Sequence, residues 1–220
     1  GLHTFIYKNS GETYHANDAS SVNIYNKLKR CKANITNEYH FMMPYNIHFR
    51  FDEKLVKEMI IMDDLLMDIL VKEVLSDINN IKKYKLINNL INYPLRLTYI
   101  GGNINVLFYK VDKTKCVSCG LCVKNCQMNN IYFDKNNRVK FHSRCVMCMN
   151  CTLNCPRDAI KMGLFNKWKV NGSYNFPSIE QILIESPIIN KETKGFFKCY
   201  IKTYNYIQKR HKELFETIEK

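Results

Sequence analysis

Residues 116–126 read CVSCGLCVKNC, and residues 145–155 read CVMCMNCTLNC. Each stretch places four cysteines in the spacing C-x2-C-x2-C-x3-C, and the second run follows the first at an offset of 29 residues. A cubane iron–sulfur cluster presents four irons at tetrahedral corners, and each iron needs one thiolate. Two such runs are typical of a protein that binds two [4Fe-4S] clusters.

The fourth cysteine of each run is expected to bind the cluster of the other run. Cysteines at every third position can wind round three corners of a cubane, whereas the fourth follows where the chain turns into a helix and points away. The pattern therefore assigns four ligands to each cluster. Cluster 1 takes Cys116, Cys119, Cys122 and Cys155, and cluster 2 takes Cys145, Cys148, Cys151 and Cys126.

The two runs are part of a longer internal repeat. CVSCGLCVKNCQMNNIYF aligns with CVMCMNCTLNCPRDAIKM, which predicts two similar half-units related by a pseudo-two-fold axis. We expect short strands beside the clusters, with residues 107–111 pairing with residues 159–162. Residues 131–133 and 138–141 are predicted to form a hairpin around the turn sequence Asp134-Lys135-Asn136-Asn137.

Two other uses of cysteine fit this spacing less well. A structural zinc site favours two cysteine pairs around one ion, which leaves the third cysteine of each run without a role. A disulfide scaffold would scatter cysteines along a short secreted chain, whereas only Cys31 and Cys199 lie outside the two runs. Because metal-bound thiolates need a reducing compartment, we expect a cytoplasmic protein in which Cys31 and Cys199 are ordinary reduced thiols.

The chain is basic, with 33 Lys and Arg against 20 Asp and Glu and a formal net charge of +13. Each bound cluster would add about −2, which leaves roughly +9. Basic residues are spread along the sequence, so most are expected to form a solvated surface. Four of them could face a redox partner with an acidic docking surface. They are Lys113, Lys115, Lys124 and Arg144.

Some partners and locations are not expected. The sequence shows no helicase, nuclease or glycosylase motif, so no nucleic-acid partner is predicted. No stretch approaches the roughly 18 apolar residues that a transmembrane helix needs. The first residues show no basic-then-apolar signal pattern.

Residues 1–85 show the pattern of an α/β segment. A strand is predicted at residues 4–7 and a helix at residues 18–29, followed by a second strand at residues 39–43 that Pro44 ends. Asp52 is expected to cap a long helix that extends toward Ile81. This order favours a parallel sheet. Two strands alone do not form a stable sheet, so another part of the protein would have to complete it.

The rest of the chain divides into a connector and a helical extension. Residues 86–107 are predicted to form a connector because Pro94 and the Gly101-Gly102 pair mark breaks. Residues 181–220 contain an apolar stripe at helical spacing with lysines around it. This helix is expected to pack on its own domain, and contact with a membrane surface or a partner is the alternative.

Residues 108–177 resemble the ferredoxin part of the flavodoxin–ferredoxin fusion proteins of anaerobic bacteria. The likeness rests on FYKVDKTKCVSCGLCVKNCQMNNIYF, then CVMCMNCTLNCPRDAIKMG, then NGSYNFP, where Tyr174 and Pro177 form a Tyr-x-x-Pro motif. Gln127 stands where a proline usually follows the fourth cysteine, whereas Pro156 keeps that place in the second run. This change affects local rigidity and leaves the ligands intact.

Residues 1–85 are similar to the second half of the flavodoxin-like domain of those proteins. The resemblance implies that the loop at residues 8–12 lies near a flavin ring, with Asn9, Ser10 and Gly11 as candidate flavin-binding residues. The phosphate-cradling Ser/Thr-Gly-Asn loop of the first half is absent, so the chain is not expected to bind flavin mononucleotide by itself. A truncated sequence or a truncated gene would explain the absence of that half, and the sequence upstream of Gly1 would distinguish them.

The sequence therefore predicts an α+β protein that carries single electrons at low potential through two [4Fe-4S] clusters. Its expected parts are a partial flavodoxin-like segment (1–85), a connector (86–107), a two-cluster ferredoxin domain (108–180) and a C-terminal helical extension (181–220). One alternative is the iron–sulfur portion of a flavin-linked oxidoreductase. Another is a nucleic-acid protein with structural clusters. An electron carrier needs no catalytic residue, and none is predicted.

Overall fold

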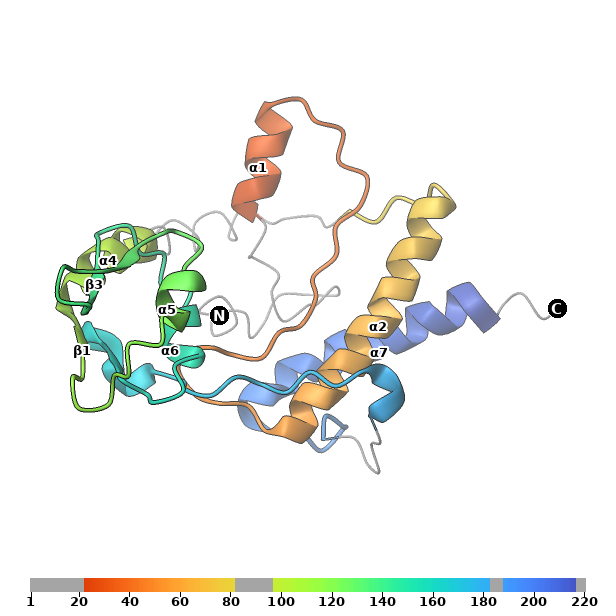
Figure 1. The fold of residues 1–220 in the computed structure, drawn as a ribbon. Coiled ribbons are helices and arrows are strands. Elements are labelled where there is room, and N and C mark those ends of the chain that lie inside the picture. Colours follow the sequence, from red (N-terminus) through yellow and green to blue (C-terminus); the bar gives the residue numbers. More distant parts are fainter. Residues whose placement is uncertain (1–21, 82–96, 183–187, 217–220) are drawn as a thin grey trace. The chain divides into compact units, whose positions relative to one another are not determined.

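Short strands near the cysteine runs and long helices elsewhere belong to two separate units of the computed structural model (Figure 1). The structure describes residues 22–81, 97–182 and 188–216. Within these ranges, residues 44–51 and 97–174 form the cysteine-rich unit. The remaining described residues form the helical unit. The mixture of helices and antiparallel strands is the α+β fold that the sequence predicts.

The cysteine-rich unit consists of short elements that follow one another along the chain. They are helix α4 (Leu97–Asn105), the 3-10 helix η2 (Val106–Phe108), strand β1 (Tyr109–Val111), helix α5 (Leu121–Lys124), strand β2 (Ile131–Phe133), strand β3 (Val139–Phe141), helix α6 (Asn150–Leu153), strand β4 (Ile160–Met162) and the 3-10 helix η3 (Gly163–Trp168). Elements this short bury little surface by themselves, so their arrangement depends on the turns and ligands between them.

Two antiparallel strand pairs flank the cysteine runs, which confirms the predicted pairings. β1 pairs with β4, with Tyr109 opposite Met162, and β2 pairs with β3, with Ile131 opposite Phe141. In each pair the inward side chains alternate with exposed ones, as a strand with one buried face requires. The hairpin predicted around residues 134–137 is therefore present.

Both pairs continue in the same way beyond their strands. The backbone N–H of Asp112 donates to the carbonyl of Ala159, and that of His142 donates to the carbonyl of Asn130, each at 2.8 Å. Asn130 and Ala159 are separated by the 29-residue offset of the repeat. Strand pairing therefore follows the internal repeat.

The predicted connector contains a helix in its described part. α4 runs through the Gly101-Gly102 pair, so the break expected there is wrong. A Cβ atom on Gly102 would lie 2.6 Å from the carbonyl oxygen of Cys145, whereas one on Gly101 would meet nothing within 4 Å. Glycine costs a helix about 1 kcal/mol relative to alanine. The packing of α4 against the second cysteine run offsets that cost. This packing is possible only because residue 102 has no side chain.

Residues 44–51 belong to the cysteine-rich unit although they precede it in the chain. The buried Tyr174 hydroxyl donates to the carbonyl of Tyr45 at 2.7 Å and accepts from the backbone N–H of Phe51 at 2.9 Å. The Arg50 guanidinium lies over the Tyr174 ring, 4.4 Å from its centroid. Tyr174 thus attaches this early segment to the unit that follows.

The helical unit contains longer elements. They are helix α1 (Val22–Arg30), helix α2 (Glu53–Leu75), the 3-10 helices η4 (Ile179–Gln181) and η5 (Gly195–Phe197), and helix α7 (Lys198–Phe215). Asp52 caps α2 as predicted, because its carboxylate accepts from the backbone N–H of Lys54 at 2.8 Å. α2 ends before the expected Ile81, and Asp77 adopts a left-handed backbone with φ of 52° just after it.

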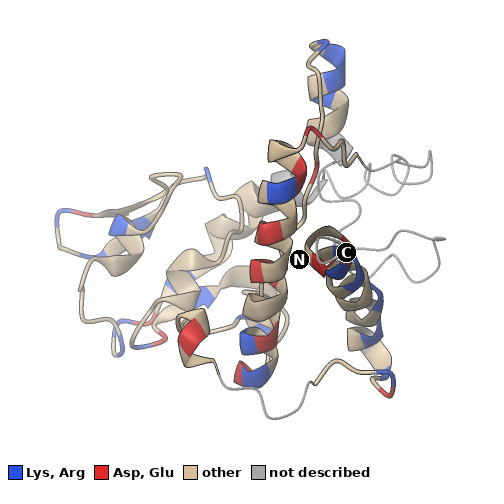
Figure 2. Ribbon diagram, turned by 90° about the vertical axis from the view of Figure 1, so that its right-hand side faces the viewer, with Lys and Arg blue, Asp and Glu red and all other residues tan. Residues whose placement is uncertain are grey.

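Helices α2 and α7 pack against each other within this unit, which confirms the packing predicted for the C-terminal helix. The core between them includes Val56, Met59 and Ile69 of α2 and Tyr204 and Ile207 of α7, all buried. α2 carries six Asp and Glu against three Lys, and α7 carries five Lys and Arg against one Glu (Figure 2). Opposite net charges therefore add to the apolar contact. None of the helices in the described ranges has the length and apolar composition needed to cross a membrane.

The strand predicted at residues 39–43 is wrong. Polar groups of this segment are satisfied by α2 and by the turn after it, and no neighbouring strand is present there. Within it, the Tyr39 hydroxyl donates to the Glu73 carboxylate at 2.7 Å, and the backbone N–H of Met42 donates to the Asp63 carboxylate at 2.8 Å. Just before it, the N–H of Glu38 donates to the carbonyl of Asn80, also at 2.8 Å. Since residues 22–81 contain no strand, the partial flavodoxin-like segment has no support in the described structure. The strand predicted at residues 4–7 lies outside the described residues.

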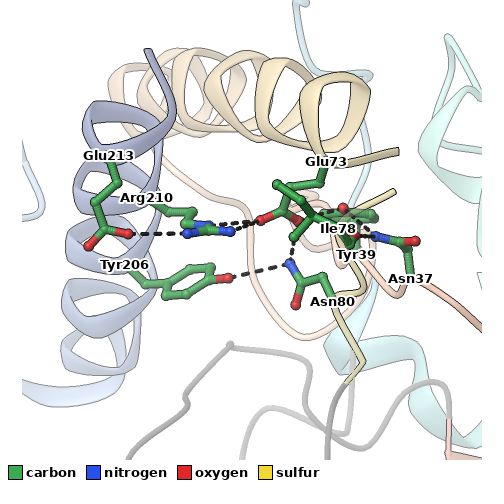
Figure 3. A network of polar contacts seen from close by, with 8 residues as sticks. All are labelled: Asn37, Tyr39, Glu73, Ile78, Asn80, Tyr206, Arg210 and Glu213. Carbon is green, nitrogen blue, oxygen red and sulfur yellow. Dashed lines mark hydrogen bonds and ion pairs between the residues drawn. The ribbon is translucent and has the colours of Figure 1, made fainter. Parts of the chain in front are cut away.

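A buried carboxylate organises the polar contacts between α2 and α7 (Figure 3). Glu73 is 1% exposed, and one of its oxygens accepts from both Nε and Nη2 of Arg210, each at 2.7 Å. The other oxygen accepts from the Tyr39 hydroxyl at 2.7 Å and from the Asn80 amide at 2.8 Å. Burial, followed by the hydrogen bond to Glu73, raises the pKa of Tyr39 to about 12, so its hydroxyl stays a donor.

Replacing Arg210 should destabilise the helical unit strongly. In Arg210→Met the Glu73 carboxylate stays buried without its cation, which costs about 3 to 5 kcal/mol in the free energy of unfolding. Urea unfolding followed by far-ultraviolet circular dichroism measures this loss. Adding Glu73→Gln to Arg210→Met should recover most of it, because the buried charge is then gone while the acceptor for Tyr39 remains.

Lys209→Met provides the matched control on the same helix. Lys209 is 80% exposed and lies 3.8 Å from Glu213, so its removal should cost less than about 1 kcal/mol. Equal losses for the two single variants would contradict the role assigned to the Glu73–Arg210 pair.

Candidate metal centre

The backbone around the two cysteine runs has the same conformation. In the first run, Ser118, Gly120 and Asn129 have positive φ angles of 52°, 78° and 47°. Their counterparts one repeat later, Met147, Met149 and Asp158, have φ angles of 53°, 61° and 47°. Left-handed backbone at non-glycine residues costs about 1 kcal/mol or more per residue. Its recurrence at the same three places shows that both runs wind in the same way.

Each run turns left-handed on both sides of its second cysteine and then enters a short helix. α5 begins after Gly120 and α6 begins after Met149, and both helices end before the fourth cysteine. The chain therefore turns into a helix where the spacing predicts it. The second cysteine of each run, Cys119 or Cys148, is exposed, and the other six are half-buried.

Backbone N–H groups donate to several cysteine sulfurs. Cys126 accepts from Asn130 and Cys155 accepts from Ala159, both at 3.3 Å, so the fourth cysteines of the two runs have equivalent donors. Cys145 accepts from the N–H of Met147 at 3.4 Å. Donors of this kind stabilise thiolate charge and influence the reduction potential of a bound cluster.

One cavity brings together cysteines from both runs. Its lining includes Cys116, Cys119 and Cys122 of the first run and Cys155 of the second, which are the four residues predicted for cluster 1. The remaining walls are largely apolar. They include Val111, Val117, Leu121, Val139, Pro156 and Ile160.

The other four cysteines influence one another through their charges. Burial raises the pKa of Cys151 to about 12, and Cys145 and Cys148 contribute next, followed by Cys122 and Cys126. Burial likewise raises the pKa of Cys145, with added contributions from Cys148 and Cys126. Cys122 and Cys126 therefore both lie near Cys151, and Cys126 also lies near Cys145. Because the metal-free thiols resist ionisation, binding of a metal cluster would release protons.

The cysteine donors fit thiolate-bound iron better than a single metal ion. No group of three or more His, Cys, Asp or Glu side chains in the described ranges is arranged to hold one ion. A zinc ion would require its thiolates about 2.3 Å from a common centre. In a cubane each thiolate binds a different iron, so the sulfurs surround a larger volume.

A hydrophobic core lies directly against the cysteines. Ile47, Tyr109, Met149, Ile160 and Met162 are buried in it together with Val106, and Cys122, Cys145 and Cys151 pack against it. Burial raises the pKa of the Tyr109 phenol, which stays neutral. Such apolar surroundings exclude water from cluster sulfurs and influence the reduction potential.

The early segment also reaches this site, which sequence reasoning missed. Ile47 enters the core, and the Asn46 amide donates to the carbonyl of Cys148 at 2.6 Å. Residues 44–51 have no periodicity or metal-binding motif that points to this role. The Tyr-x-x-Pro motif is the one sequence feature connected with this role, because the Tyr174 hydroxyl holds residues 44–51 in place. The predicted flavin-binding residues, Asn9, Ser10 and Gly11, lie outside the described residues.

Comparison with known protein families identifies this part of the chain. Residues 115–160 match the family model of a 4Fe-4S dicluster domain. These residues form a dicluster domain. All eight cysteines of the two runs lie within it, and such a domain binds two [4Fe-4S] clusters. No curated protein and no solved structure matched the chain. The comparisons offer no support for a flavodoxin fusion.

Gly102 should be essential to the packing of α4 against the dicluster domain. In Gly102→Ala the new methyl group meets the Cys145 carbonyl at 2.6 Å, so α4 must shift away from a cysteine of the second run. We expect a loss of about 1 to 3 kcal/mol in the free energy of unfolding and a lower iron content. Urea unfolding and iron analysis of the reconstituted protein measure the two effects.

Gly101→Ala is the control one residue away on the same helix. Open space surrounds this position, so alanine should stabilise α4 by about 0.5 to 1 kcal/mol and leave iron content unchanged. If both alanine variants behaved alike, the close approach of α4 to Cys145 would have no energetic importance.

Proposed function

We propose that the dicluster domain carries single electrons at low potential for a redox partner protein. The observation that carries this proposal is the repeated pair of cysteine runs with equivalent backbone, both placed against one apolar core. No described side chain needs to act as an acid, base or nucleophile in this role. A carrier needs to hold two clusters close together, shield them from water and bring one edge of each near the surface.

We further propose that the fourth cysteines cross between the clusters. Cys155 shares a cavity with Cys116, Cys119 and Cys122, which supports cluster 1 as assigned. Cys126 contributes to the raised pKa values of Cys145 and Cys151, which supports its place in cluster 2. Crossed ligands hold the two half-units together, because each half-unit supplies one thiolate to the other.

The residues around the clusters suit this role in three ways. When bound, a [4Fe-4S] cluster takes up and releases one electron. Cys119 and Cys148 are exposed, so each run presents one sulfur to a partner. Cys122 contributes to the raised pKa of Cys151, so the inner sides of the two ligand sets lie close together. The apolar walls beside Cys122 and Cys151 keep water out of the space between them.

Anaerobic reconstitution with iron and sulfide tests the proposed cofactor and function together. About eight iron and eight sulfide per chain are expected, with reversible one-electron reduction of each cluster. The amounts are measured by metal and sulfide analysis and the reduction by a potentiometric titration. A protein that took up one or two zinc ions and no iron would exclude the proposal.

Pairs of alanine substitutions should distinguish crossed from uncrossed ligands by iron content alone. With crossed ligands, Cys116→Ala combined with Cys155→Ala damages cluster 1 only, and about four iron per chain remain. Cys116→Ala combined with Cys126→Ala damages both clusters and leaves almost no iron. Uncrossed ligands give the opposite result for the two pairs.

Cys31→Ala serves as the control for loss of a thiol. Cys31 is exposed on the other unit and is not a proposed ligand, so this variant should keep about eight iron. Iron loss in Cys31→Ala would mean that iron content does not report on the proposed ligand sets.

A further inference from the structure

Positive charge is concentrated in the cysteine-rich unit. Its described residues contain thirteen Lys and Arg and three Asp and Glu, a formal net charge of +10. The described residues of the helical unit contain fourteen basic and thirteen acidic residues, a net charge of +1. Two clusters at about −2 each would leave the cysteine-rich unit near +6. Most of the excess lies in one part of the chain, because residues 97–174 contain twelve of these thirteen basic residues and all three acidic ones.

The three acidic residues of this unit are all used in its own structure. Asp112 accepts from the backbone N–H and the hydroxyl of Thr114 and lies 3.7 Å from Lys161. Asp134 closes the β2–β3 turn by accepting two backbone N–H groups, each at 2.9 Å. Asp158 forms an ion pair with Lys169. The three carboxylates keep their negative charge, which the net charge of +10 already counts. The backbone hydrogen bond from Arg138 and then the positive charges of Lys140 and Arg138 lower the pKa of Asp134, so this carboxylate lies near two exposed basic residues.

Four of the exposed basic residues line one groove between β1 and β3. They are Lys110, Lys113, Arg138 and Lys140. No Asp or Glu lines this groove. Cys116, a proposed ligand of cluster 1, lies on its wall, and Leu107 at its edge is 69% exposed. A cleft lined by charges of one sign attracts a partner of the opposite charge.

We propose that this groove binds an acidic segment of the redox partner and that cluster 1 exchanges electrons with that partner. This inference rests on the proposed function, because it identifies where that function meets its partner. Complementary charge would attract the partner, and Cys116 on the groove wall places one ligand of cluster 1 beside the bound segment.

The groove suits an acidic protein better than a nucleic acid. Non-specific binding of single strands relies on aromatic side chains on which bases can stack. Tyr109 and Phe141 line the groove, but Tyr109 is buried and the two rings pack edge to face, 5.4 Å apart. The edge of one ring therefore meets the face of the other, while Leu107 remains available for an apolar contact.

Charge-reversal variants of the reconstituted full chain test this proposal. Lys113→Glu and Arg138→Glu each reverse one groove charge. Lys167→Glu makes the same change at an exposed residue of the same unit outside the groove. The probes are a synthetic oligoglutamate peptide, whose binding is measured by fluorescence anisotropy, and anionic iron(III)–EDTA, which the reduced protein reduces in a stopped-flow measurement.

Each groove variant should bind the peptide about tenfold more weakly at low salt and reduce iron(III)–EDTA several-fold more slowly. Both effects should shrink as ionic strength rises. Lys167→Glu should change either quantity by less than about twofold. All three variants should keep about eight iron per chain. Their reduction potentials are measured beside the rates, because added negative charge near a cluster lowers its potential and by itself would not slow the reduction of iron(III)–EDTA. Iron content thus tests the proposed function separately from the groove.

Three results would overturn the proposal. Equal losses of peptide affinity in all three variants would mean that the net charge of the unit, and not the groove, attracts the peptide. Binding of a single-stranded oligonucleotide, with no binding of oligoglutamate, would indicate a nucleic-acid surface. If either glutamate variant lost iron, the milder variants Lys113→Gln and Arg138→Gln would be tested in place of the glutamate variants. Unchanged peptide binding in both glutamine variants would refute binding at the groove.

Discussion

Each cubane requires four thiolates, and this requirement dictates the backbone of the dicluster domain. In each run a short helix begins at the residue before the third cysteine and ends before the fourth. Left-handed residues on both sides of Cys119 and Cys148 let three cysteines face one centre, and α5 and α6 then carry Cys126 and Cys155 away. In the crossed arrangement that we propose, this departure joins the two half-units. Strands of three residues suffice beside such a site because the ligands fix the chain where a larger sheet would otherwise be needed.

Segments outside the cysteine runs complete the surroundings of the metal centre. α4 approaches the carbonyl of Cys145 so closely that only glycine fits at residue 102, and Asn46 donates to the carbonyl of Cys148. Both contacts involve the second run, which has methionines at the positions where the first run has Ser118 and Gly120. The larger side chain of Met149 fills the core that these segments enclose. The two half-units therefore share a backbone but have different surroundings, which is a physical basis for two clusters of different potential.

The sequence predicted those parts of the fold that depend on local chemistry. The cysteine spacing, the strands beside it and the Asp52 cap of α2 are fixed by ligand geometry, turn residues and capping within a few positions, and all are present. The prediction of a strand at residues 39–43 was wrong. An apolar stretch before a proline has the same sequence pattern whether it pairs with another strand or packs against a helix. Polar groups of Tyr39 and Met42 donate to Glu73 and Asp63, which are distant in sequence. The helix through Gly101 and Gly102 was missed for a similar reason, since the contact that justifies Gly102 is to a residue of the second run.

The two units differ in their numbers of acidic residues, and this difference explains their charges. In the helical unit, acidic and basic residues are nearly equal in number: Asp52 and Asp63 accept backbone N–H groups, and the buried Glu73 forms an ion pair with Arg210. In the cysteine-rich unit the short elements leave many turns to close, and Asp112 and Asp134 close them by accepting backbone N–H groups. The thiolates that bind clusters supply the remaining negative charge. A surface rich in Lys and Arg then offsets the charge of the clusters, so the basic character of this unit is consistent with the cofactors that it binds.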